Sequence, residues 1–467
     1  MQIYVIIVSL ISIFVALRYS PKDAFLCVFL PIFILIPQSI KANISGFPDL
    51  SLGHASLLAI FSITIITQKK YKITLLDGLI LFFVLCMTYS EYIAVHIGDY
   101  IKEDALESRA RYSNYALARQ LLFNKITYVM IPFLLGKCLI SSLKDSERFI
   151  KYFVLFVSFV VLVSVYEFRM THNLYMTFSQ EVLGESPGFI RPMLRYGLVR
   201  VTGPFFQPLF FGTFIAVALL LNYWHRWNGG WREYKSFISM SFIFQCILFL
   251  GLFMTLSRGP LMSVFFGFMI VGIGFHGNYK KVMFIRSILF LSLVAVCVSL
   301  FVLYSGQRME LAADVSERNI YYRVQMFEDY VPIVMEKPLW GWGQDLWPQV
   351  SVKSIDNQFL WLALNHGLVT LGVFLLIPSY LLIRLFVRVM KPLSGNLKCN
   401  SFAFLLGGLI LSIQVSLVTL FLYNQMEIFL FFLYGWTEGD LIRNPKEYIS
   451  GTKHEKTVEV INCYSYS

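Results

Sequence analysis

The stretch LFMTLSRGPLMS, from Leu252 to Ser263, places a single arginine, Arg258, between two apolar runs. Apolar runs of this kind recur along the whole chain and are separated by short charged segments. A helix crosses a bilayer with about 20 apolar residues, whereas the strands of an outer-membrane barrel alternate in polarity over about ten residues. The pattern on both sides of Arg258 therefore predicts an all-α, polytopic membrane protein.

The composition agrees with this fold class. Hydrophobic residues make up 57% of the 467 positions and charged residues 14%, against about 45–50% and about 25% in soluble domains. The net charge is +11, but lysine and arginine lie in short loops between apolar runs, where they set membrane topology. We therefore expect no nucleic-acid partner. The seven cysteines are scattered without metal-ligand spacing, so neither a zinc site nor a disulfide framework is indicated.

The apolar runs predict about 12 transmembrane helices. The first run has no positively charged segment before it and no cleavage site after it, so we interpret it as a helix and not as a signal peptide. A short run at 428–436 is either a half-span or the last helix. The predicted spans are residues 3–17, 24–36, 52–67, 75–95, 120–140, 149–168, 204–224, 237–256, 260–275, 287–304, 358–386 and 402–423.

Clusters of Lys and Arg in short loops predict the orientation, because such loops stay on the cytoplasmic side. This places three larger segments outside, at 96–119, 169–203 and 305–355, the last of them before the final helices. We expect one polytopic membrane domain over residues 1–440 and a cytoplasmic tail over 441–467. The side of the N-terminus stays open. The positive loops lie at 69–72, 144–151, 226–235, 280–286 and 384–391.

The last outer segment contains a predicted amphipathic helix. Its apolar residues recur at spacings of three and four, which is the period of one helix face. The sequence KPLWGWGQDLWP then breaks the helix and supplies Trp340, Trp342 and Trp347. Because indole rings favour the membrane interface, we expect this loop to lie on the bilayer surface. The predicted stripe consists of Ile320, Val324, Phe327, Val331 and Val334.

Local signals place Arg258 at an outward-facing helix N-terminus. Ser257 is a plausible N-cap, and Pro260 fits the first helical turn. Free amides, the positive end of the helix dipole and a guanidinium would meet there, which suits a phosphate. An arginine that reaches outer headgroups as a topological anchor explains the same residue equally well.

Arg200 stands at a second outer mouth, in RVTGPFFQPLFFG, just before an apolar run. Two such mouths would hold a diphosphate, with one arginine for each phosphate. The alternative for Arg200 is a loop residue that pairs with Glu181, Glu185 or lipid.

A third candidate lies in SVKSIDNQFLWLALNHG, where Asp356 and Asn357 open a helix after the outer segment. Asp356 is a good N-cap, and we favour that interpretation from spacing alone. The functional alternative is a general base that takes a proton from a sugar hydroxyl. His366 lies about three turns deeper in the same helix, where we expect a hydrogen-bonded packing residue.

These motifs, in this order, resemble the family of O-antigen ligases and Wzy-type O-antigen or exopolysaccharide polymerases. The resemblance covers residues 200–376, and the order and spacing of the motifs carry it. The matching stretches are RVTGPFFQP, TLSRGP, RNIYYRVQMFEDYVPIVMEKPLWGWGQD and IDNQFLWLALNHGLVTLGVFLL.

The resemblance implies a GT-C-like, metal-independent glycosyltransferase without cofactors, in the bacterial inner (cytoplasmic) membrane. Its active site would lie on the periplasmic face. The donor would be a glycan on undecaprenyl diphosphate, and an acceptor hydroxyl would displace the lipid diphosphate with inversion at the anomeric carbon. The bilayer, a chain-length regulator and a flippase are the further partners implied.

Residue by residue, the resemblance assigns Arg200 and Arg258 to the diphosphate, with Arg258 also stabilising the leaving group. Arg318 and Arg323 match basic positions of the outer loop, and we place them with Asn357 in contact with the substrate or acceptor. The family's ligases usually show a histidine immediately before this asparagine, where this chain has Asp356. The difference favours a polymerase or a divergent member of the family, with Asp356 as base.

Three functions follow as hypotheses. The first is a polymerase that joins lipid-linked repeat units of a surface polysaccharide. The second is an O-antigen ligase that moves a finished glycan to lipid A-core or another acceptor. The third, of another class, is a flippase or transporter. Transporters often show two related halves with a site near the bilayer midplane, whereas the candidates here cluster at one outer face.

Overall fold

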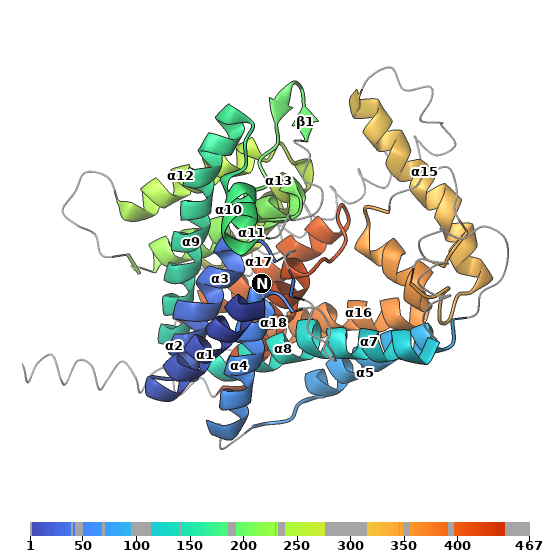
Figure 1. The fold of residues 1–467 in the computed structure, drawn as a ribbon, viewed down its shortest axis with the longest axis horizontal. Helices are drawn as coiled ribbons and strands as arrows, with labels where there is room; N and C mark the ends of the chain where they lie inside the picture. The colour runs from blue at the N-terminus through green and yellow to red at the C-terminus, as the bar shows by residue number, and fades with distance from the viewer. Residues whose placement is uncertain are drawn as a thin grey trace, which may run out of the picture.

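The computed structural model describes residues 2–38, 41–42, 50–67, 71–94, 114–140, 142–184, 193–228, 230–231, 239–275, 315–344, 346–348, 355–390 and 397–443. In the helices that begin at residues 315 and 397, side chains are described only from residues 321 and 400 onward. The regular secondary structure of the described part is helical, as predicted, except for one small hairpin and an isolated bridge between Ala42 and Leu50 (Figure 1). The elements are α1 (Gln2–Arg18), α2 (Pro21–Ala24), η1 (Phe25–Phe29), α3 (Leu30–Leu35), α4 (Leu52–Thr67), α5 (Leu75–Tyr92), α7 (Asn114–Lys125), η2 (Ile126–Met130), α8 (Ile131–Leu139), α9 (Leu143–Met170), α10 (Leu174–Leu183), β1 (Leu194–Arg195), β2 (Leu198–Val199), α11 (Pro208–Trp227), α12 (Met240–Met254), α13 (Arg258–Val271), η3 (Gly272–Phe275), α15 (Val315–Glu336), α16 (Gln358–Met390), α17 (Leu397–Leu417) and α18 (Gln425–Ile442).

The described residues contain seven helical stretches long and apolar enough to cross a membrane. Three shorter apolar helices, α1, α4 and α12, accompany them. The chain is therefore a multi-pass membrane protein. The predicted span at 287–304 lies outside the described residues. The seven stretches are Leu75–Tyr92, Asn114–Leu139, Leu143–Met170, Pro208–Trp227, Arg258–Phe275, Gln358–Met390 and Asn400–Leu417.

The short apolar run predicted at 428–436 belongs to a full helix, α18, which is buried along nearly its whole length. It packs against α8, and glycines occupy the contact. A Cβ atom on Gly136 or Gly435 would collide with the backbone of the facing helix. Small residues that let backbones approach closely are typical of helix pairs in membranes.

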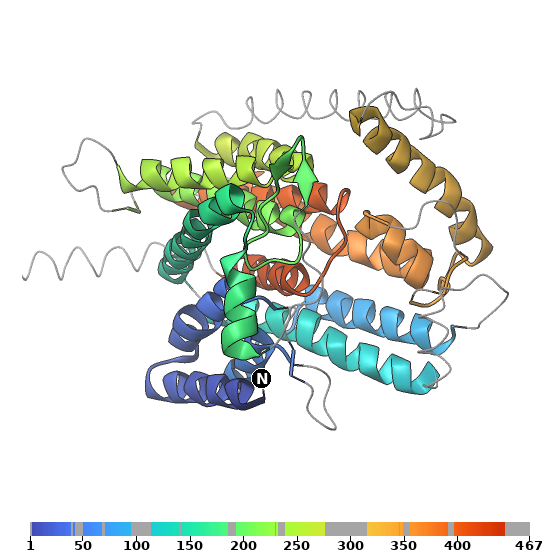
Figure 2. The ribbon, with the colours of Figure 1, turned by 45° about the horizontal axis from the view of Figure 1, so that its top comes forward.

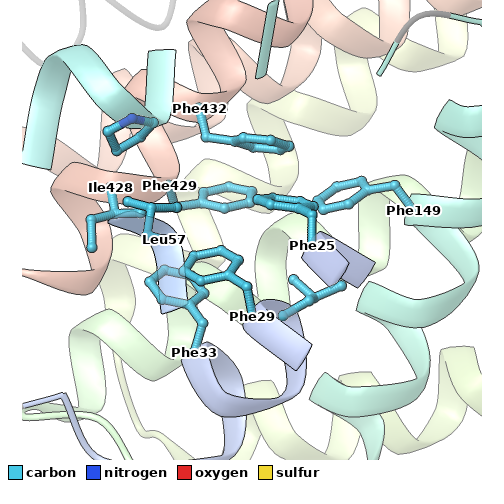
Figure 3. A pocket seen from close by; sticks show the side chains of 10 residues that line it. Phe25, Phe29, Phe33, Leu57, Phe149, Ile428, Phe429 and Phe432 are labelled. Atoms are coloured by element: carbon cyan, nitrogen blue, oxygen red, sulfur yellow. The ribbon is translucent and has the colours of Figure 1, made fainter. Parts of the chain in front are cut away.

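Phenylalanine rings fill the space where η1, α9 and α18 meet (Figure 3). Phe25 stacks on Phe432 with ring centroids 4.9 Å apart, and Phe149 lies 5.3 Å from Phe432. The gap left among these rings has a volume of only about 10 Å³ and an entirely apolar lining. A gap of that size is about the minimum for one water molecule. This region is therefore packed core and not a ligand site.

The predicted span 358–386 is not one continuous helix. The backbone leaves helical geometry at Gly367, which has φ 77° and ψ 173°. Residues 338–343 cross the break and supply its hydrogen bonds. An unpaired backbone group in an apolar environment costs several kcal/mol, on the order of a lost hydrogen bond or more. The four bonds run from Trp342 N to Leu364 O and Gly343 N to Asn365 O, both 2.9 Å, and from Leu368 N to Pro338 O and Val369 N to Leu339 O, 2.7 and 3.4 Å.

Two of the three tryptophans that we predicted at the bilayer surface are buried within the protein. Trp342 and Trp347 are 5% and 4% exposed. The indole N–H of Trp342 donates to the carbonyl oxygen of Ile333 at 2.9 Å. The tryptophans are buried because the loop packs between α15 and the first part of α16, and Figure 2 shows α15 leaning over that part.

The apolar face predicted for α15 is correct only in part. Val324 and Val334 are buried, but Val331 is 43% exposed. Tyr330 and Ile333 are buried instead. The buried face is rotated from the predicted one because α15 packs against the tryptophan loop and the first part of α16.

Replacing Gly367 by alanine should lower the free energy of unfolding by about 3 kcal/mol. Its φ is unfavourable for any other residue, and the added Cβ would collide with the backbone of Leu339. Gly372→Ala is the matched control, because it lies in the same helix with open space around it. We expect it to be neutral or to stabilise by up to about 1 kcal/mol. Thermal unfolding of both variants in detergent tests this, and equal midpoints would contradict it.

Candidate functional site

The turn between α12 and α13 forms the base of the candidate site. Leu256 holds the left-handed conformation, with φ 47°, and α13 begins at Arg258. Ser257 occupies the N-cap position as predicted, but it makes no capping hydrogen bond. Its hydroxyl donates instead to the carbonyl oxygen of Thr255 at 3.0 Å. The amides of the first turn of α13 are therefore left without this side-chain acceptor.

Two arginines from the preceding segment hold this turn. Arg200 donates from Nε to Thr255 O at 3.1 Å and from Nη2 to Ser257 Oγ at 2.8 Å. Arg195 donates from Nη1 to Leu256 O at 2.6 Å. Carbonyl groups at a helix end carry partial negative charge, which favours a cation there. Among the described residues, Arg200 therefore binds the turn and does not pair with Glu181, one of the alternative partners. Glu185, another alternative partner, lies outside the described residues.

The acceptors of Arg195 and Arg200 are neutral oxygens, so the two positive charges are not cancelled by these contacts. Burial, together with the charge of Arg195, lowers the pKa of Arg200 to about 10. Two cations held together in a partly buried place repel each other. An anion bound between them would relieve that repulsion.

Arg258 is exposed and carries the third positive charge. Its Nη2 donates to the Tyr196 hydroxyl at 2.8 Å. Tyr196 and Gly197 form the turn of the β1–β2 hairpin, with φ 54° and 75°. Two successive residues with positive φ are typical of a tight two-residue hairpin turn. Sequence reasoning missed this hairpin, for which the Tyr-Gly pair was the only local signal.

α15 adds Arg323, the fourth positive charge. Its side chain reaches solvent, but the protein packed around it removes part of its hydration and so lowers the pKa of the guanidinium. Asp356 raises that pKa, while Arg195 and Arg258 lower it further. These three charged groups, Asp356, Arg195 and Arg258, are therefore within electrostatic reach of Arg323. Figure 1 shows α15 and the hairpin at the same end of the molecule. Arg318 also lies in α15, but its side chain lies outside the described part.

The N-cap of α16 is Asn357, so our preferred interpretation of Asp356 as the cap is wrong. Leu360 N donates to Asn357 Oδ1 at 2.9 Å. Asn357 Nδ2 donates to Val418 O at 3.0 Å, and the residue is 2% exposed. This amide is committed to the fold, which argues against its predicted contact with an acceptor. Asp356, one residue earlier, is half-buried and close enough to Arg323 to interact with its charge.

A buried carboxylate positions the loop that carries Arg200. Glu167, near the end of α9, accepts hydrogen bonds from Thr202 N at 2.9 Å, Thr202 Oγ1 at 3.0 Å and Gly203 N at 2.9 Å. Gly203 has φ 57°, a conformation that favours glycine. The RVTGP motif is thus held by α9 on one side and by the α12–α13 turn on the other.

His366 is a packing residue, as expected. It is fully buried, and its Nδ1 lies 2.6 Å from Ser90 Oγ. It directly precedes the break in α16 at Gly367. We assign it no part in the site.

The arrangement suits an anion that carries several charges. Arg195, Arg200, Arg258 and Arg323 supply guanidinium donors, and the start of α13 adds the positive end of a helix dipole. Asp356 adds one carboxylate beside them. Guanidinium groups bind phosphate oxygens in a bidentate manner, and a neighbouring carboxylate can accept a proton.

Comparison with known families agrees with the resemblance seen in the sequence. Residues 243–375 match the family model described as O-antigen ligase. The matched segment contains Arg258, Arg323 and Asp356, together with the break in α16, whereas Arg195 and Arg200 precede it. No curated protein matches the chain.

Replacing Glu167 by alanine should destabilise the protein by about 1–3 kcal/mol, because buried N–H groups of Thr202 and Gly203 would lose their acceptor. Glu181→Ala removes an exposed carboxylate from α10 and should have little effect. Comparing the unfolding midpoints of the two variants in detergent tests this. The same midpoint in both would show that Glu167 does not hold the loop.

Proposed function

We propose that this protein is a glycosyltransferase of the bacterial inner membrane that polymerises undecaprenyl-diphosphate-linked oligosaccharide repeat units during surface polysaccharide biosynthesis. The chemistry would take place on the periplasmic face. The observation that carries the proposal is the gathering of Arg195, Arg200 and Arg258 at the α12–α13 turn, with Arg323 near enough for its charge to interact with Arg195, Arg258 and Asp356. Most of this group lies in the segment that matches the O-antigen ligase family.

The donor diphosphate would bind between Arg258 and Arg200. Arg258 and the first amides of α13 would face one phosphate, where the helix dipole adds to the attraction. Arg200 uses two of its N–H directions to hold the turn, and a guanidinium has five N–H donors. The remaining donors would face the second phosphate. Arg323, in α15, would contact the diphosphate from the outer side and complete the group of four arginines.

The reaction would be a direct displacement. A hydroxyl oxygen of the acceptor glycan attacks the anomeric carbon of the donor, and the bond from that carbon to the diphosphate oxygen breaks. The electron pair leaves with the lipid diphosphate, whose growing charge the guanidinium of Arg258 stabilises. The hydroxyl proton passes to the carboxylate of Asp356. In this proposal the arginines, and not a metal ion, offset the leaving-group charge.

A ligase is the second candidate, because the matching family model is described as O-antigen ligase. It would use the same donor site and transfer the finished glycan to lipid A-core or another acceptor. Asp356, where the ligases that the chain resembles usually have histidine, favours the polymerase. A flippase and a chain-length regulator are the partners we propose for either enzyme.

The break in α16 gives little support to a transporter. Transporters use the open ends of broken helices to hold substrate or ions. Here the loop 338–343 already pairs with the backbone groups on both sides of Gly367. Those groups are therefore occupied within the protein.

Arg258→Ala should reduce glycan polymerisation by about 100-fold or more, the cost typical of removing one preorganised charge donor. The assay uses purified protein in nanodiscs with lipid-linked repeat units, and a ladder of products on a gel is the readout. The control is Arg226→Ala, which removes an exposed arginine near the C-terminal end of α11, whereas the site lies near the N-terminal end of that helix. A normal ladder from Arg258→Ala would overturn its role. Transfer only to an added acceptor, with no ladder, would establish the ligase.

Asp356→Asn should lower the rate by about 100-fold or more, because an amide cannot accept the proton. Glu336→Gln, an exposed carboxylate at the end of α15, is the control. A rate in Asp356→Asn equal to that of the unchanged protein would remove Asp356 from the role of base.

A further inference from the structure

A cavity lies beside the segment that carries Asp356. Its volume is about 440 Å³, within the range of about 300–1,000 Å³ typical of small-molecule sites. Ile355 lines it, while the next residue, Asp356, interacts with the charge of Arg323. The cavity and the arginine group therefore adjoin at residues 355–356. None of the four arginines lines the cavity.

The walls of the cavity combine flat aromatic rings with side-chain amides. Tyr128, Trp347 and Trp361 supply rings, and Asn124 and Gln344 supply amide donors and acceptors. A sugar ring has a face of C–H groups and an edge of hydroxyl groups. Aromatic rings can pack against the C–H face, and amides, which both donate and accept hydrogen bonds, can bind the hydroxyl groups.

An ion pair forms part of the same wall. Lys125 Nζ lies 2.6 Å from Glu427 Oε1, and the two side chains are only 14% and 10% exposed. A pair so far withdrawn from water has a large desolvation cost and needs further hydrogen bonds to offset it. Sugar hydroxyls can accept from the ammonium and donate to the carboxylate. The pair is thus suited to a neutral, hydroxyl-rich ligand.

The backbone of the wall is irregular at two places. Tyr128 lies in η2, a π-helical turn between α7 and α8, and such turns occur frequently at functional sites. Asn424 has φ 31° and ψ −93°, a conformation that non-glycine residues rarely adopt. Strained residues of this kind cluster at ligand sites. Behind the wall, the buried ring of His54 packs edge-on against Tyr128 at 4.0 Å and so fixes its position.

We propose that this cavity binds the terminal sugar of the acceptor glycan and presents one of its hydroxyls to Asp356. The inference rests on the proposed function and adds the acceptor subsite to it. Asn124, Lys125, Gln344 and Glu427 provide the polar contacts, and the aromatic rings provide the apolar ones.

Asn124→Ala tests this in the nanodisc assay, with the acceptor supplied as carrier-free oligosaccharide released from the native polysaccharide by mild acid. The acceptor KM should rise about 3- to 10-fold, the effect of one lost hydrogen bond, while kcat and the donor KM stay unchanged. Glu427→Gln should act in the same direction. The control is Gln120→Ala, an exposed amide on the same helix that does not line the cavity. Unchanged acceptor KM in both cavity variants would overturn the proposal.

A binding measurement separates this proposal from the proposed function. Trp347 and Trp361 line the cavity, so the same oligosaccharide should change the tryptophan emission of the full-length protein, more weakly in Asn124→Ala. Binding of this kind without any glycan product would support the cavity and overturn the glycosyltransferase. Product formation without any emission change, and with wild-type acceptor KM in Asn124→Ala, would retain the enzyme and overturn the acceptor subsite.

Discussion

The hydrogen bonds between the loop 338–343 and the two parts of α16 are the constraint on which the site depends. Backbone groups freed at a helix break in an apolar environment have no water to bind, so they need protein partners. The loop supplies them from a segment more than 20 residues earlier in the chain. It thereby ties the end of α15 to the first part of α16. One set of contacts places both Arg323 and Asp356.

The charged residues of this protein fall into two groups with different surroundings. At the ends of several helices, cations pair directly with carboxylates, as in Lys137 with Asp77 and Arg388 with Asp440. Such pairs neutralise each other and serve the fold. Arg195 and Arg200 donate instead to carbonyl and hydroxyl oxygens. Those contacts orient the guanidinium groups and leave their charge in place, which is what binding a multiply charged anion requires.

The positive group and the cavity are built from separate parts of the chain. The hairpin and the α12–α13 turn form most of the arginine group. The helix α7 and the segment before α18 form much of the cavity wall. Among the described residues, the segment just before α16, with Ile355 and Asp356, borders both. The segment that matches the O-antigen ligase family supplies this shared border, and residues outside it complete the walls on each side. A donor site and an acceptor site could therefore change independently.

The sequence alone determined the features that depend on local chemistry. The length of the apolar runs identified most of the spanning helices, because the need to pair backbone groups in lipid acts within each segment. Ser257 and Pro260 likewise predicted that Arg258 starts a helix. The tertiary structure decided the rest. Asp356 and Asn357 are equally good caps, and Asn357 is the one that also reaches the carbonyl oxygen of Val418. The break at Gly367 was invisible in an apolar run, because the groups that satisfy it come from a distant loop.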